Sequence, residues 1–436
     1  MEEKKILKVL ADQQEEKNNY NFTQWCDRRE EVLFEWDSNM AQVVIGVRRS
    51  GKSILCHKVL LQHRVEYAYV NFDDDRLARL TIEDLDALLN CIYQLYGADI
   101  KYLFFDEIQD VEGWHLFVNR LLRLNFHIFL TGSNAKLLSG ELATHLTGRY
   151  NEIRLYPFSF EETCKHKKIE TAGLTTKAEA VQKSELNLYL QNGGLPEFTH
   201  IKNPLNRKNY VEGLIETIIN KDIAKRFNIR NTEGLRRITH HLINNVCQGI
   251  SYESLAETAN ISSTATAQKY VSYLTQAFLI QKIQKFSFKS KDRIRGEKAY
   301  VVDTGFISNR DNSLLGENLG WRLENAVFVE LLRRHKSAAE DIYYYKPTTR
   351  SKEVDFVVCR QGLVKELVQV AYSISETKTY KRETEALIEA SSTLNCNDLT
   401  LISFDESRTI ETKGKTIKIV SAPEWFLLSS VNQGDY

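Results

Sequence analysis

The sequence contains 436 residues, of which 42% are hydrophobic and 27% are charged, as in ordinary globular proteins. At ~150 residues per domain this length predicts roughly three domains, and the 20 glycines and 5 prolines exclude collagen-like or low-complexity architectures. The 58 basic and 58 acidic residues cancel, which argues against a uniformly basic nucleic-acid coat but not against a local basic patch.

The seven cysteines are scattered and none forms a Cys-x-x-Cys pair, so neither structural zinc nor a disulfide framework is expected. The first ten residues are charged throughout and lack the apolar core of a signal peptide. No run of 18 apolar residues occurs, and therefore no transmembrane helix is expected. These features favour a reduced, cytoplasmic protein that does not bind membranes.

The pattern Gly-x-x-x-x-Gly-Lys-Ser runs from Gly46 to Ser53, after an apolar segment that begins at Ala41 and before a helix-like segment that ends at Leu61. In this pattern the glycines let successive N–H groups face the β-phosphate of a nucleotide, and the following helix adds its positive end. Lys52 is expected to reach the β- and γ-phosphates of ATP, and Ser53 to give Mg²⁺ a hydroxyl ligand. A chance glycine-rich turn before a helix is the alternative. The predicted ATP-binding residues are Gly46, Val47, Arg48, Arg49, Ser50, Gly51, Lys52 and Ser53.

A second apolar segment, residues 101–109, indicates a buried parallel strand that ends in two acids. Acids at the carboxyl end of such a strand lie beside the crevice where ligands bind. Asp106 is therefore expected to hold Mg²⁺, and Glu107 to polarise an attacking water; capping of the next helix is the alternative. That helix is predicted from core residues at helical spacing, which are Trp114, Phe117, Val118, Leu121 and Leu122.

Residues 126–134 predict another short strand with polar residues at its end. Ser133 or Asn134 is expected to sense the γ-phosphate or to orient the water, although Gly-Ser-Asn is also turn chemistry. Arg149 follows a glycine and precedes a further strand. It is a candidate to neutralise charge on the γ-phosphate, either in the same chain or in a neighbouring subunit of a homo-oligomer. An ordinary surface arginine is the alternative.

Taken in order, these segments resemble the prokaryotic AAA-type ATPases that carry a C-terminal domain of unknown function. The shared features are paired arginines in the phosphate loop (Arg48 and Arg49), a strand ending in Asp-Glu-Ile-Gln, a Thr-Gly-Ser strand, and Gly-Arg-Tyr followed by Pro-Phe-Ser-Phe-Glu, all within residues 41–162. The resemblance implies an AAA/STAND-like core of five strands and nucleotide-dependent assembly or partner binding. The Gly-Gly-Leu-Pro element at residues 193–196 resembles the lid junction of this group and is a candidate hinge.

From Ile250 onward the pattern changes to two short helices, at 252–259 and 264–274, and then to two alternating segments, at 278–288 and 298–303. Helix, turn, helix and hairpin are typical of a winged helix. Residues 282–298 carry a net five positive charges, so contact with DNA phosphates is expected, whereas base-specific readout is not. A protein-binding winged helix with a solvated charged loop is the alternative. The candidate DNA contacts are Lys285, Lys289, Lys291, Arg293 and Arg295.

Residues 320–436 form another α/β pattern, whose order resembles the restriction-endonuclease-like PD-(D/E)xK fold. In active members of that fold a helix Glu, a strand Asp and a following Glu-x-Lys bind a divalent metal and activate water. Here Glu324 and Asp355 match the first two positions, but Gln369 and Ala371 stand where the Glu and the Lys are expected. Because Gln is a neutral and weaker ligand, a degenerate domain that does not cleave nucleic acid is expected.

Two features keep other roles open for this region. Lys346 or Lys352 could replace the missing lysine, which leaves an ATP-controlled nuclease as an alternative. The three tyrosines at 343–345 could stack on bases, although half-buried strand positions are the commoner use of such residues.

The sequence as a whole predicts an α/β protein of four parts. These are a P-loop, AAA-like ATPase core with a parallel sheet at 1–160, a helical lid at 161–230, a winged helix at 231–305 and a degenerate PD-(D/E)xK nuclease-like domain at 306–436. The predicted function is Mg²⁺-dependent ATP hydrolysis, coupled to conformational switching and to binding of DNA or an unknown protein partner. A nucleotide-gated binding module with little turnover is the alternative.

Overall fold

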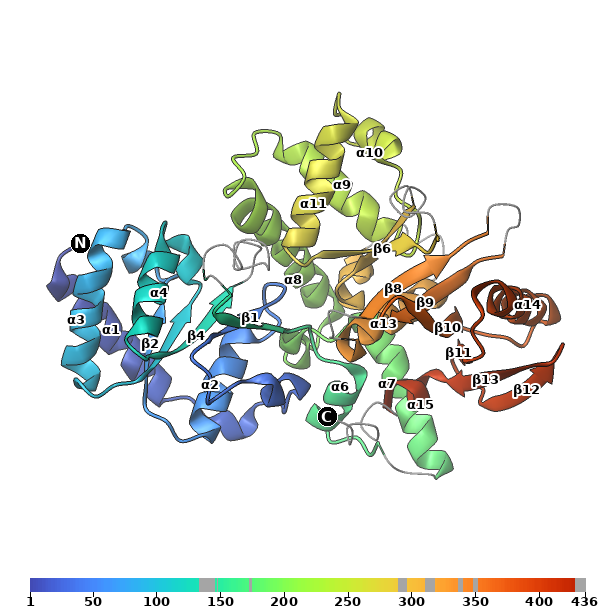
Figure 1. Ribbon diagram of the computed structural model, residues 1–436, viewed down its shortest axis with the longest axis horizontal. Coiled ribbons are helices and arrows are strands. Elements are labelled where there is room, and N and C mark those ends of the chain that lie inside the picture. Colours follow the sequence, from blue (N-terminus) through green and yellow to red (C-terminus); the bar gives the residue numbers. More distant parts are fainter. Residues whose placement is uncertain are drawn as a thin grey trace. The chain divides into compact units, whose positions relative to one another are not determined.

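The computed structural model describes residues 1–132, 146, 148–171, 175–288, 296–309, 318–335, 340–347 and 352–427. The chain forms two compact units, residues 1–156 with 276–278 and residues 157–275 with 279–436 (Figure 1). Several predicted site residues lie outside the described residues, namely Ser133, Asn134, Lys289, Lys291, Arg293 and Arg295. None of the described helices is long and apolar enough to cross a membrane.

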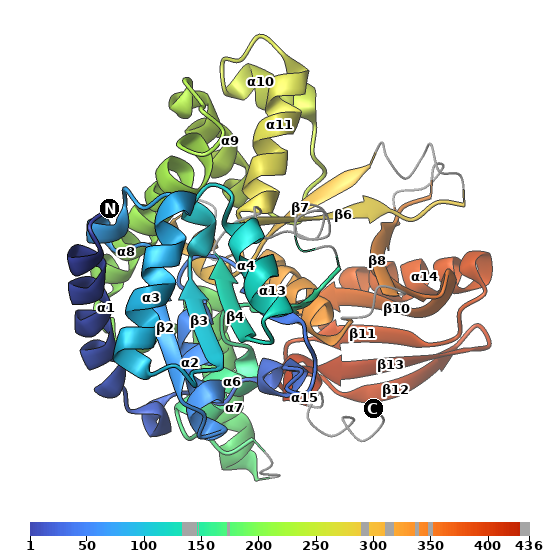
Figure 2. The same cartoon turned by 60° about the vertical axis from the view of Figure 1, so that its left-hand side comes forward.

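The first unit is built on a five-stranded sheet in the order β2-β3-β4-β1-β5, and every neighbouring pair in it is parallel (Figure 2). Its strands are β1 Ala41–Ile45, β2 Tyr67–Asn71, β3 Tyr102–Asp106, β4 His127–Gly132 and β5 Tyr150–Arg154. The helices of this unit are α1 Glu3–Asn18, α2 Lys52–Gln62, α3 Leu85–Tyr96 and α4 Trp114–Arg123. Helical crossovers of this kind are what allow consecutive strands to run in the same direction.

Helices cover both faces of this sheet, which explains why its strands are almost wholly apolar. Phe104 of β3 packs in one core cluster with Leu55 and Val59 of α2. The next residue, Phe105, points to the other face and lies 6.0 Å from Phe117 of α4, measured between ring centroids. All five core residues predicted for α4 are buried, as their spacing indicated.

The second unit begins with helices. They are α6 Phe160–His166, α7 Thr176–Asn192, α8 Pro204–Thr217, a π-helical segment Ile218–Ala224, α9 Thr232–Asn244, α10 Tyr252–Thr258 and α11 Thr264–Gln276. After α11 the chain forms an antiparallel hairpin of β6 Ile280–Lys285 and β7 Glu297–Val301. This element order is the one expected for a winged helix, and that assignment stays a prediction.

A mixed eight-stranded sheet, in the order β12-β13-β11-β10-β9-β8-β6-β7, forms the rest of the second unit. Besides the hairpin it contains β8 Glu340–Tyr345, β9 Val354–Arg360, β10 Leu363–Ala371, β11 Leu399–Ser403, β12 Arg408–Thr412 and β13 Lys415–Ser421, with helices α13 Leu319–Arg334, α14 Thr377–Leu394 and α15 Ala422–Leu427. Strand β6 pairs in parallel with β8, so the hairpin and the C-terminal strands share one sheet across the boundary predicted at 305/306. The residue ranges of the four parts stay a prediction.

Helices also cover both faces of this second sheet. Phe328 of α13 stacks on Phe356 of β9, with ring centroids 5.9 Å apart. The neighbouring strand residue, Val357, belongs to the core cluster that contains Leu387 of α14. The predicted fold class is therefore confirmed: an α/β protein with a parallel P-loop sheet, followed by helices and a second, mixed sheet.

The Gly-Gly-Leu-Pro junction after α7 is fixed by one buried carboxylate, that of Asp303. Its two oxygens accept the backbone N–H groups of Gly194 and Gly305 at 2.7 and 2.8 Å. Gly193 has a φ of +81°, and a Cβ atom there would lie only 1.8 Å from Oδ1 of Asp303, so a glycine is required. Burial raises the pKa of Asp303 to about 6, although the two N–H groups and the charge of Arg333 act in the opposite direction.

We expect Asp303→Asn to lower the free energy of unfolding by about 1–3 kcal/mol at neutral pH, because an amide leaves one buried N–H facing another donor. The folded-state pKa of Asp303 is raised, so its contribution to stability is complete below pH 4 and is lost as the pH rises through 6. The gap between wild type and variant should therefore widen from pH 7 to pH 5 in urea unfolding. Asp405→Asn, at an exposed site, is the control; equal unfolding midpoints for all three proteins would contradict this account.

Candidate functional site

The segment between β1 and α2 forms a loop around the amine of Lys52, the first residue of α2. Its Nζ donates to the carbonyl oxygens of Gly46 and Val47, each at 3.1 Å. A Cβ atom on Gly46 would lie 2.1 Å from the carbonyl oxygen of Leu155, so only glycine fits this close approach. Gly51 has a φ of +94°, which glycine adopts without strain. The two glycines of the pattern are therefore both required by the shape of the loop.

The polar residues of the loop have distinct positions. Arg48 lies 3.8 Å from Asp73, measured between guanidinium and carboxylate. Arg49 is exposed and takes a left-handed backbone conformation, with φ of +69°. Ser50 is fully buried, and its carbonyl oxygen accepts a hydrogen bond from Arg28 at 3.2 Å.

The carboxylate of Asp106, at the end of β3, is surrounded by hydroxyl groups. Thr131 of β4 donates its hydroxyl to Oδ1 of Asp106, and Tyr69 of β2 donates to Oδ2 at 3.2 Å. The hydroxyl of Ser53 lies near enough to this carboxylate to lower its pKa. Asp106 is only 6% exposed, so the hydrogen bonds from Thr131 and Tyr69 are made away from bulk water. The loop serine and the strand acid, predicted separately, are thus brought close together.

Electrostatic forces on Asp106 oppose one another. Burial raises its pKa above the ordinary value, and the negative charge of neighbouring Glu107 adds to the rise. The hydroxyl groups of Thr131 and Ser53 and the positive charge of Lys52 act against this rise. A divalent cation beside Asp106 would favour the ionised form, since opposite charge lowers the pKa of a carboxyl group.

The register of the parallel sheet explains why these groups meet. Asp106 of β3 is paired with Thr131 of β4, and Ile45 at the end of β1 is paired with Gly132. Because all the strands run in one direction, their carboxyl ends lie along the same edge of the sheet. Ligands of open α/β sheets bind beside that edge.

Glu107 directly follows β3 and begins a tight turn, with a left-handed φ of +59°. Its N–H donates to the carbonyl oxygen of Thr131 at 3.2 Å, and its carboxylate accepts the side-chain amide of Gln109. The Glu107 side chain is half-buried. It therefore lies at the same edge as Asp106 but in a wetter environment.

The donors at this edge fit Mg²⁺. Ser53, Asp106 and Thr131 offer hydroxyl and carboxylate oxygens, the hard ligands that Mg²⁺ prefers. Mg²⁺ usually takes one or two protein carboxylates and completes its shell with water and substrate phosphates. One carboxylate beside a phosphate loop is such a set.

Arg149 lies at the opposite edge of the sheet from the phosphate loop. Its carbonyl oxygen accepts the N–H of Ala41, the first residue of β1, at 3.0 Å. The loop begins only after the last residue of β1, roughly 16 Å further along at ~3.3 Å per residue. The prediction that Arg149 neutralises the γ-phosphate of its own chain is therefore wrong. Its role in a neighbouring subunit stays a prediction.

Sequence reasoning missed Thr131 and Arg28. A signal for Thr131 was present, because it is the last residue but one of the strand next to Asp106. The prediction named only Ser133 and Asn134, which follow that strand. Arg28 is 8% exposed and donates to carbonyl oxygens of Ser50 and Tyr156 at 3.2 and 2.6 Å. No local signal marks Arg28, because it lies in an irregular segment far from both partners in sequence.

In the second unit the three predicted nuclease-site residues are brought together. Gln369 accepts the backbone N–H of Asp355 at 3.2 Å, and Asp355 accepts the N–H of Val370 at 2.9 Å. The pKa of Asp355 is raised well above its usual value, by burial first and then by the charge of Glu324. Burial is also the main cause that raises the pKa of Glu324.

Lys298 of β7 supplies the positive charge of this cluster. Its ammonium lies 3.8 Å from the carboxylate of Glu324 and forms an ion pair with Glu353. Burial alone would lower the pKa of Lys298, but the charges of Glu324, Asp355 and Glu353 outweigh it and raise the pKa. A further acid, Glu383 of α14, accepts the side-chain amide of Gln369 at 2.7 Å. Sequence reasoning missed both Lys298 and Glu383 as members of the cluster.

The two lysines proposed as substitutes bond elsewhere. Lys352 donates to Glu385 and Glu389 at 2.6 and 2.9 Å, and Lys346 lies 3.3 Å from Glu353. Within the part of the chain that the structure describes, no group of three or more His, Cys, Asp or Glu side chains could hold a metal ion.

The charge of the predicted basic hairpin is smaller than the sequence count suggested. Of its described lysines, Lys282 forms an ion pair with Glu297 at 2.8 Å, and Lys298 is 6% exposed within the carboxylate cluster. Lys285 is half-buried at the end of β6. The net count of five already subtracts Glu297, the partner of Lys282, but it does not include Glu324 and Glu353, the partners of Lys298, so the count is too high by the charge of Lys298.

The tyrosines of β8 pack within the second unit. Tyr344 is 7% exposed and lies under the ammonium of Lys298, 5.2 Å from nitrogen to ring centroid. Tyr343 and Tyr345 are partly buried against the core under α14. This geometry favours the half-buried strand interpretation over base stacking.

Comparison with known proteins identifies the first unit and the family. A family model described as an AAA domain matches residues 38–164, and models of two domains of unknown function match residues 183–315 and 319–425. The uncharacterized protein MJ1544 of Methanocaldococcus jannaschii is 33% identical over 404 residues, which cover 89% of this chain and 88% of MJ1544. The chain belongs to the MJ1544 family.

Another relative of this MJ1544-family chain is an uncharacterized protein of Haemophilus influenzae. It is 34% identical over 360 residues, which cover 78% of this chain and 84% of that protein. Among solved structures, the Walker-type ATPase PABY2304 of Pyrococcus abyssi aligns with a TM-score of 0.43 and 16% identity, over 65% of this chain and 95% of that one. The match to the AAA domain confirms the predicted AAA-type P-loop domain.

In this member of the MJ1544 family, Lys298→Met leaves the largely buried carboxylate of Glu324 without its cation, whereas Glu353 keeps Lys346. We expect the variant to lose about 3–5 kcal/mol of stability, the usual effect of removing one partner of a buried pair. Adding Glu324→Gln should restore part of the loss. Lys282→Met, whose lysine is 24% exposed, is the matched control and should change stability by less than about 1 kcal/mol. Urea unfolding checks all three variants against wild type, and a Lys298→Met protein as stable as the control would contradict the pairing.

Proposed function

We propose that this chain is a Mg²⁺-dependent ATPase whose nucleotide cycle drives a conformational switch and the binding of DNA or of a protein partner. The observation that carries the proposal is the parallel register of the sheet, which sets Asp106 beside the end of β1, where the loop of Lys52 and Ser53 begins. It brings a phosphate-binding loop and a metal-binding carboxylate to one edge of the sheet. The AAA-domain match over the same residues supports it.

Each residue at this edge has a defined task in the proposed reaction. The backbone N–H groups of residues 46–53 and the ammonium of Lys52 bind the phosphates and offset their negative charge. Asp106 and Ser53 would hold Mg²⁺, which when bound supplies charge neutralisation for the transferred phosphoryl group. Glu107 orients a water molecule for attack in line with the γ-phosphate and takes up its proton.

Gln109 and Thr131 have supporting tasks. The amide of Gln109 orients the carboxylate of Glu107, and the carbonyl oxygen of Thr131 fixes the backbone of Glu107. Ser133 or Asn134, the next residues in sequence after β4, is proposed to sense the γ-phosphate. Arg149 is proposed to act on the nucleotide of a neighbouring subunit, which requires a homo-oligomer.

We expect Glu107→Gln to keep ATP affinity within about threefold but to reduce turnover by roughly 10²–10⁴-fold, the usual contribution of a general base. Lys52→Ala should weaken nucleotide binding and reduce turnover by roughly 10²–10³-fold, since it removes a preorganised cation. Calorimetric titration with MgATP and phosphate release measure the two effects. Glu112→Gln, at an exposed glutamate five positions on, is the matched control.

Three outcomes of these assays separate the candidate functions. Tight MgATP binding without phosphate release in the wild type would favour the nucleotide-gated binding module. Wild type that neither binds nor hydrolyses ATP would contradict both candidates. Equal turnover in wild type and Glu107→Gln would remove Glu107 from the mechanism.

The partner surface we propose is the hairpin of the winged-helix region, with contacts to DNA phosphates from residues 285–295. If so, double-stranded or single-stranded DNA should stimulate ATP turnover several-fold, and the effect should fade between 50 and 200 mM salt, roughly the range over which phosphate contacts weaken. Exchanging Lys285, Lys289 and Lys291 for alanine should abolish it. A triple alanine variant at the exposed lysines 365, 378 and 381 matches the charge change.

The same DNA also tests the second unit as a nuclease. We propose that it does not cleave, because neutral Gln369 replaces an acidic metal ligand and Lys298 already occupies the charge partner's place beside Glu324 and Glu353. DNA incubated with Mg²⁺ or Mn²⁺ should therefore stay intact on gels, with and without ATP. Nicking that Asp355→Ala removes would favour the ATP-controlled nuclease instead. ATP turnover that DNA does not stimulate would point to a protein partner instead of DNA.

A further inference from the structure

The segment Leu155–Phe158 links the phosphate loop to the second unit through the covalent chain itself. Leu155 continues β5, and its N–H donates to Ile45, the last residue of β1, at 2.8 Å. Its carbonyl oxygen is the atom against which Gly46 packs so closely that no Cβ fits. The first unit ends at Tyr156 and the second begins at Pro157, so this connector is where the chain passes from one unit to the other.

On the first-unit side, the guanidinium of Arg28 holds the connector and the phosphate loop together. One nitrogen donates to the carbonyl oxygen of Ser50 in the loop at 3.2 Å, and another donates to that of Tyr156 at 2.6 Å. Arg28 is 8% exposed, and both bonds are made away from water. Because a guanidinium is planar and rigid, a displacement of one carbonyl is passed to the other.

The backbone around Arg28 is tied to the helix that follows the phosphate loop. Glu31 accepts the N–H of Arg28 at 2.7 Å and the ammonium of Lys58 at 2.8 Å. Lys58 belongs to α2 and is 2% exposed. Arg28 is thus anchored to both ends of the structure that would change on phosphate binding, namely the loop and α2.

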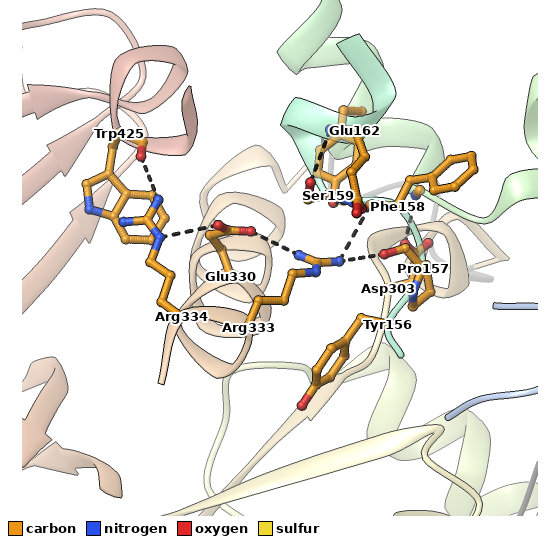
Figure 3. Close-up of polar contacts among 12 residues, drawn as sticks. Tyr156, Pro157, Phe158, Ser159, Glu162, Asp303, Glu330, Arg333, Arg334 and Trp425 are labelled. Carbon is orange, nitrogen blue, oxygen red and sulfur yellow. Dashed lines mark hydrogen bonds and ion pairs between the residues drawn. The ribbon is translucent and has the colours of Figure 1, made fainter. Parts of the chain in front are cut away.

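On the second-unit side, Arg333 of α13 has the corresponding position. It donates to the carbonyl oxygen of Pro157 at 2.9 Å and to that of Phe158 at 3.5 Å (Figure 3). Tyr189 also donates to the carbonyl of Phe158, at 2.9 Å, and the N–H of Phe158 donates to Gly194 at 2.7 Å. Three consecutive carbonyl groups, of residues 156–158, therefore accept side-chain hydrogen bonds.

A buried ion network continues from Arg333 to the end of the described chain. Glu330, 1% exposed, pairs with Arg333 and Arg334 at 3.2 Å each. Arg334 donates to the carbonyl oxygen of Trp425 at 2.6 Å and stacks over its ring at 3.8 Å. Figure 3 shows this chain of contacts running from the connector through α13 to α15.

We propose that Arg28 is a positioning residue for the phosphate loop, and that the connector at residues 155–158, held by Arg28 on one side and by Arg333 on the other, transmits the nucleotide state to α13 and α15. The inference rests on the proposed ATPase function, since it needs a nucleotide to start the signal. Burial and the hydrogen bonds to three consecutive carbonyl groups restrict the connector, so movement of Ser50 is passed along it rather than absorbed.

Hydrogen exchange with the full chain, with and without a non-hydrolysable MgATP analogue, tests this directly. In the wild type, the analogue should change exchange in peptides covering 155–162 and 326–335. Arg28→Lys keeps the charge but cannot span both carbonyls, so the analogue should bind about tenfold more weakly, the loss of one hydrogen bond to a charged donor. At saturating analogue, its exchange response beyond Tyr156 should be lost.

The variant on the other side separates transmission from binding. Arg333→Lys should bind the analogue within about twofold of wild type and keep the response of the phosphate loop, but lose that of residues 326–335. Arg64→Ala, an exposed arginine in the turn after α2, should behave as wild type. If a lysine variant does not fold, Glu31→Gln and Glu330→Gln loosen the two arginines while keeping side-chain volume.

The outcomes distinguish this proposal from the ATPase proposal. Wild type that does not bind the analogue contradicts the proposed function itself. Wild type that binds the analogue but shows no exchange change beyond Tyr156 overturns the transmission role alone. An unchanged hydrogen-exchange response to the analogue in Arg28→Lys or Arg333→Lys also overturns the transmission role. For Arg28→Lys, a loss of thermal stability that is equal with and without the analogue would mark this arginine as structural only.

Discussion

The parallel register of the five-stranded sheet is the constraint on which the proposed nucleotide site depends. It places the end of β1, Asp106 of β3 and Thr131 of β4 along one edge, so that a loop, a carboxylate and a hydroxyl meet although they are far apart in sequence. The same register moves Arg149 to the opposite edge, beside the first residue of β1. The parallel register thus brings the site residues together and places Arg149 away from them.

Buried charge is organised differently in the two units. In the first, the carboxylate of Asp106 is bonded by hydroxyl groups, with the ammonium of Lys52 nearby, which suits a group that must exchange partners when a cation and phosphates bind. In the second, the buried ammonium of Lys298 forms an ion pair with Glu353 and lies 3.8 Å from the carboxylate of Glu324. A site that satisfies its own charges has little electrostatic reason to recruit a metal ion, and we therefore regard the second cluster as structural.

The connector at residues 155–158 joins the two units through the chain and is bonded by an arginine in each. Burying its carbonyl groups without hydrogen-bond partners would cost free energy. Arg28 and Arg333, from separate elements, donate the hydrogen bonds that these carbonyl groups accept. Arginine suits this task because its planar fork can hold two acceptors in a fixed relation, whereas lysine cannot. A segment that is held from both sides is restricted in movement, and this restriction lets a local change displace residues further along the chain.

The sequence by itself determined the phosphate loop, the acidic end of β3, the α/β class and the order of helices and strands. These follow from local rules: glycine where backbones approach closely, apolar strands buried on both faces, and helical spacing in α4. The tertiary structure alone decided that Arg149 lies away from the loop, that Lys298 is a buried partner of acids, and that β6 joins the C-terminal strands. Arg28, Arg333 and Glu383 were also invisible in the sequence. Their roles depend on contacts between distant segments, and a charged side chain carries no local pattern that distinguishes a buried partner from a solvated surface group.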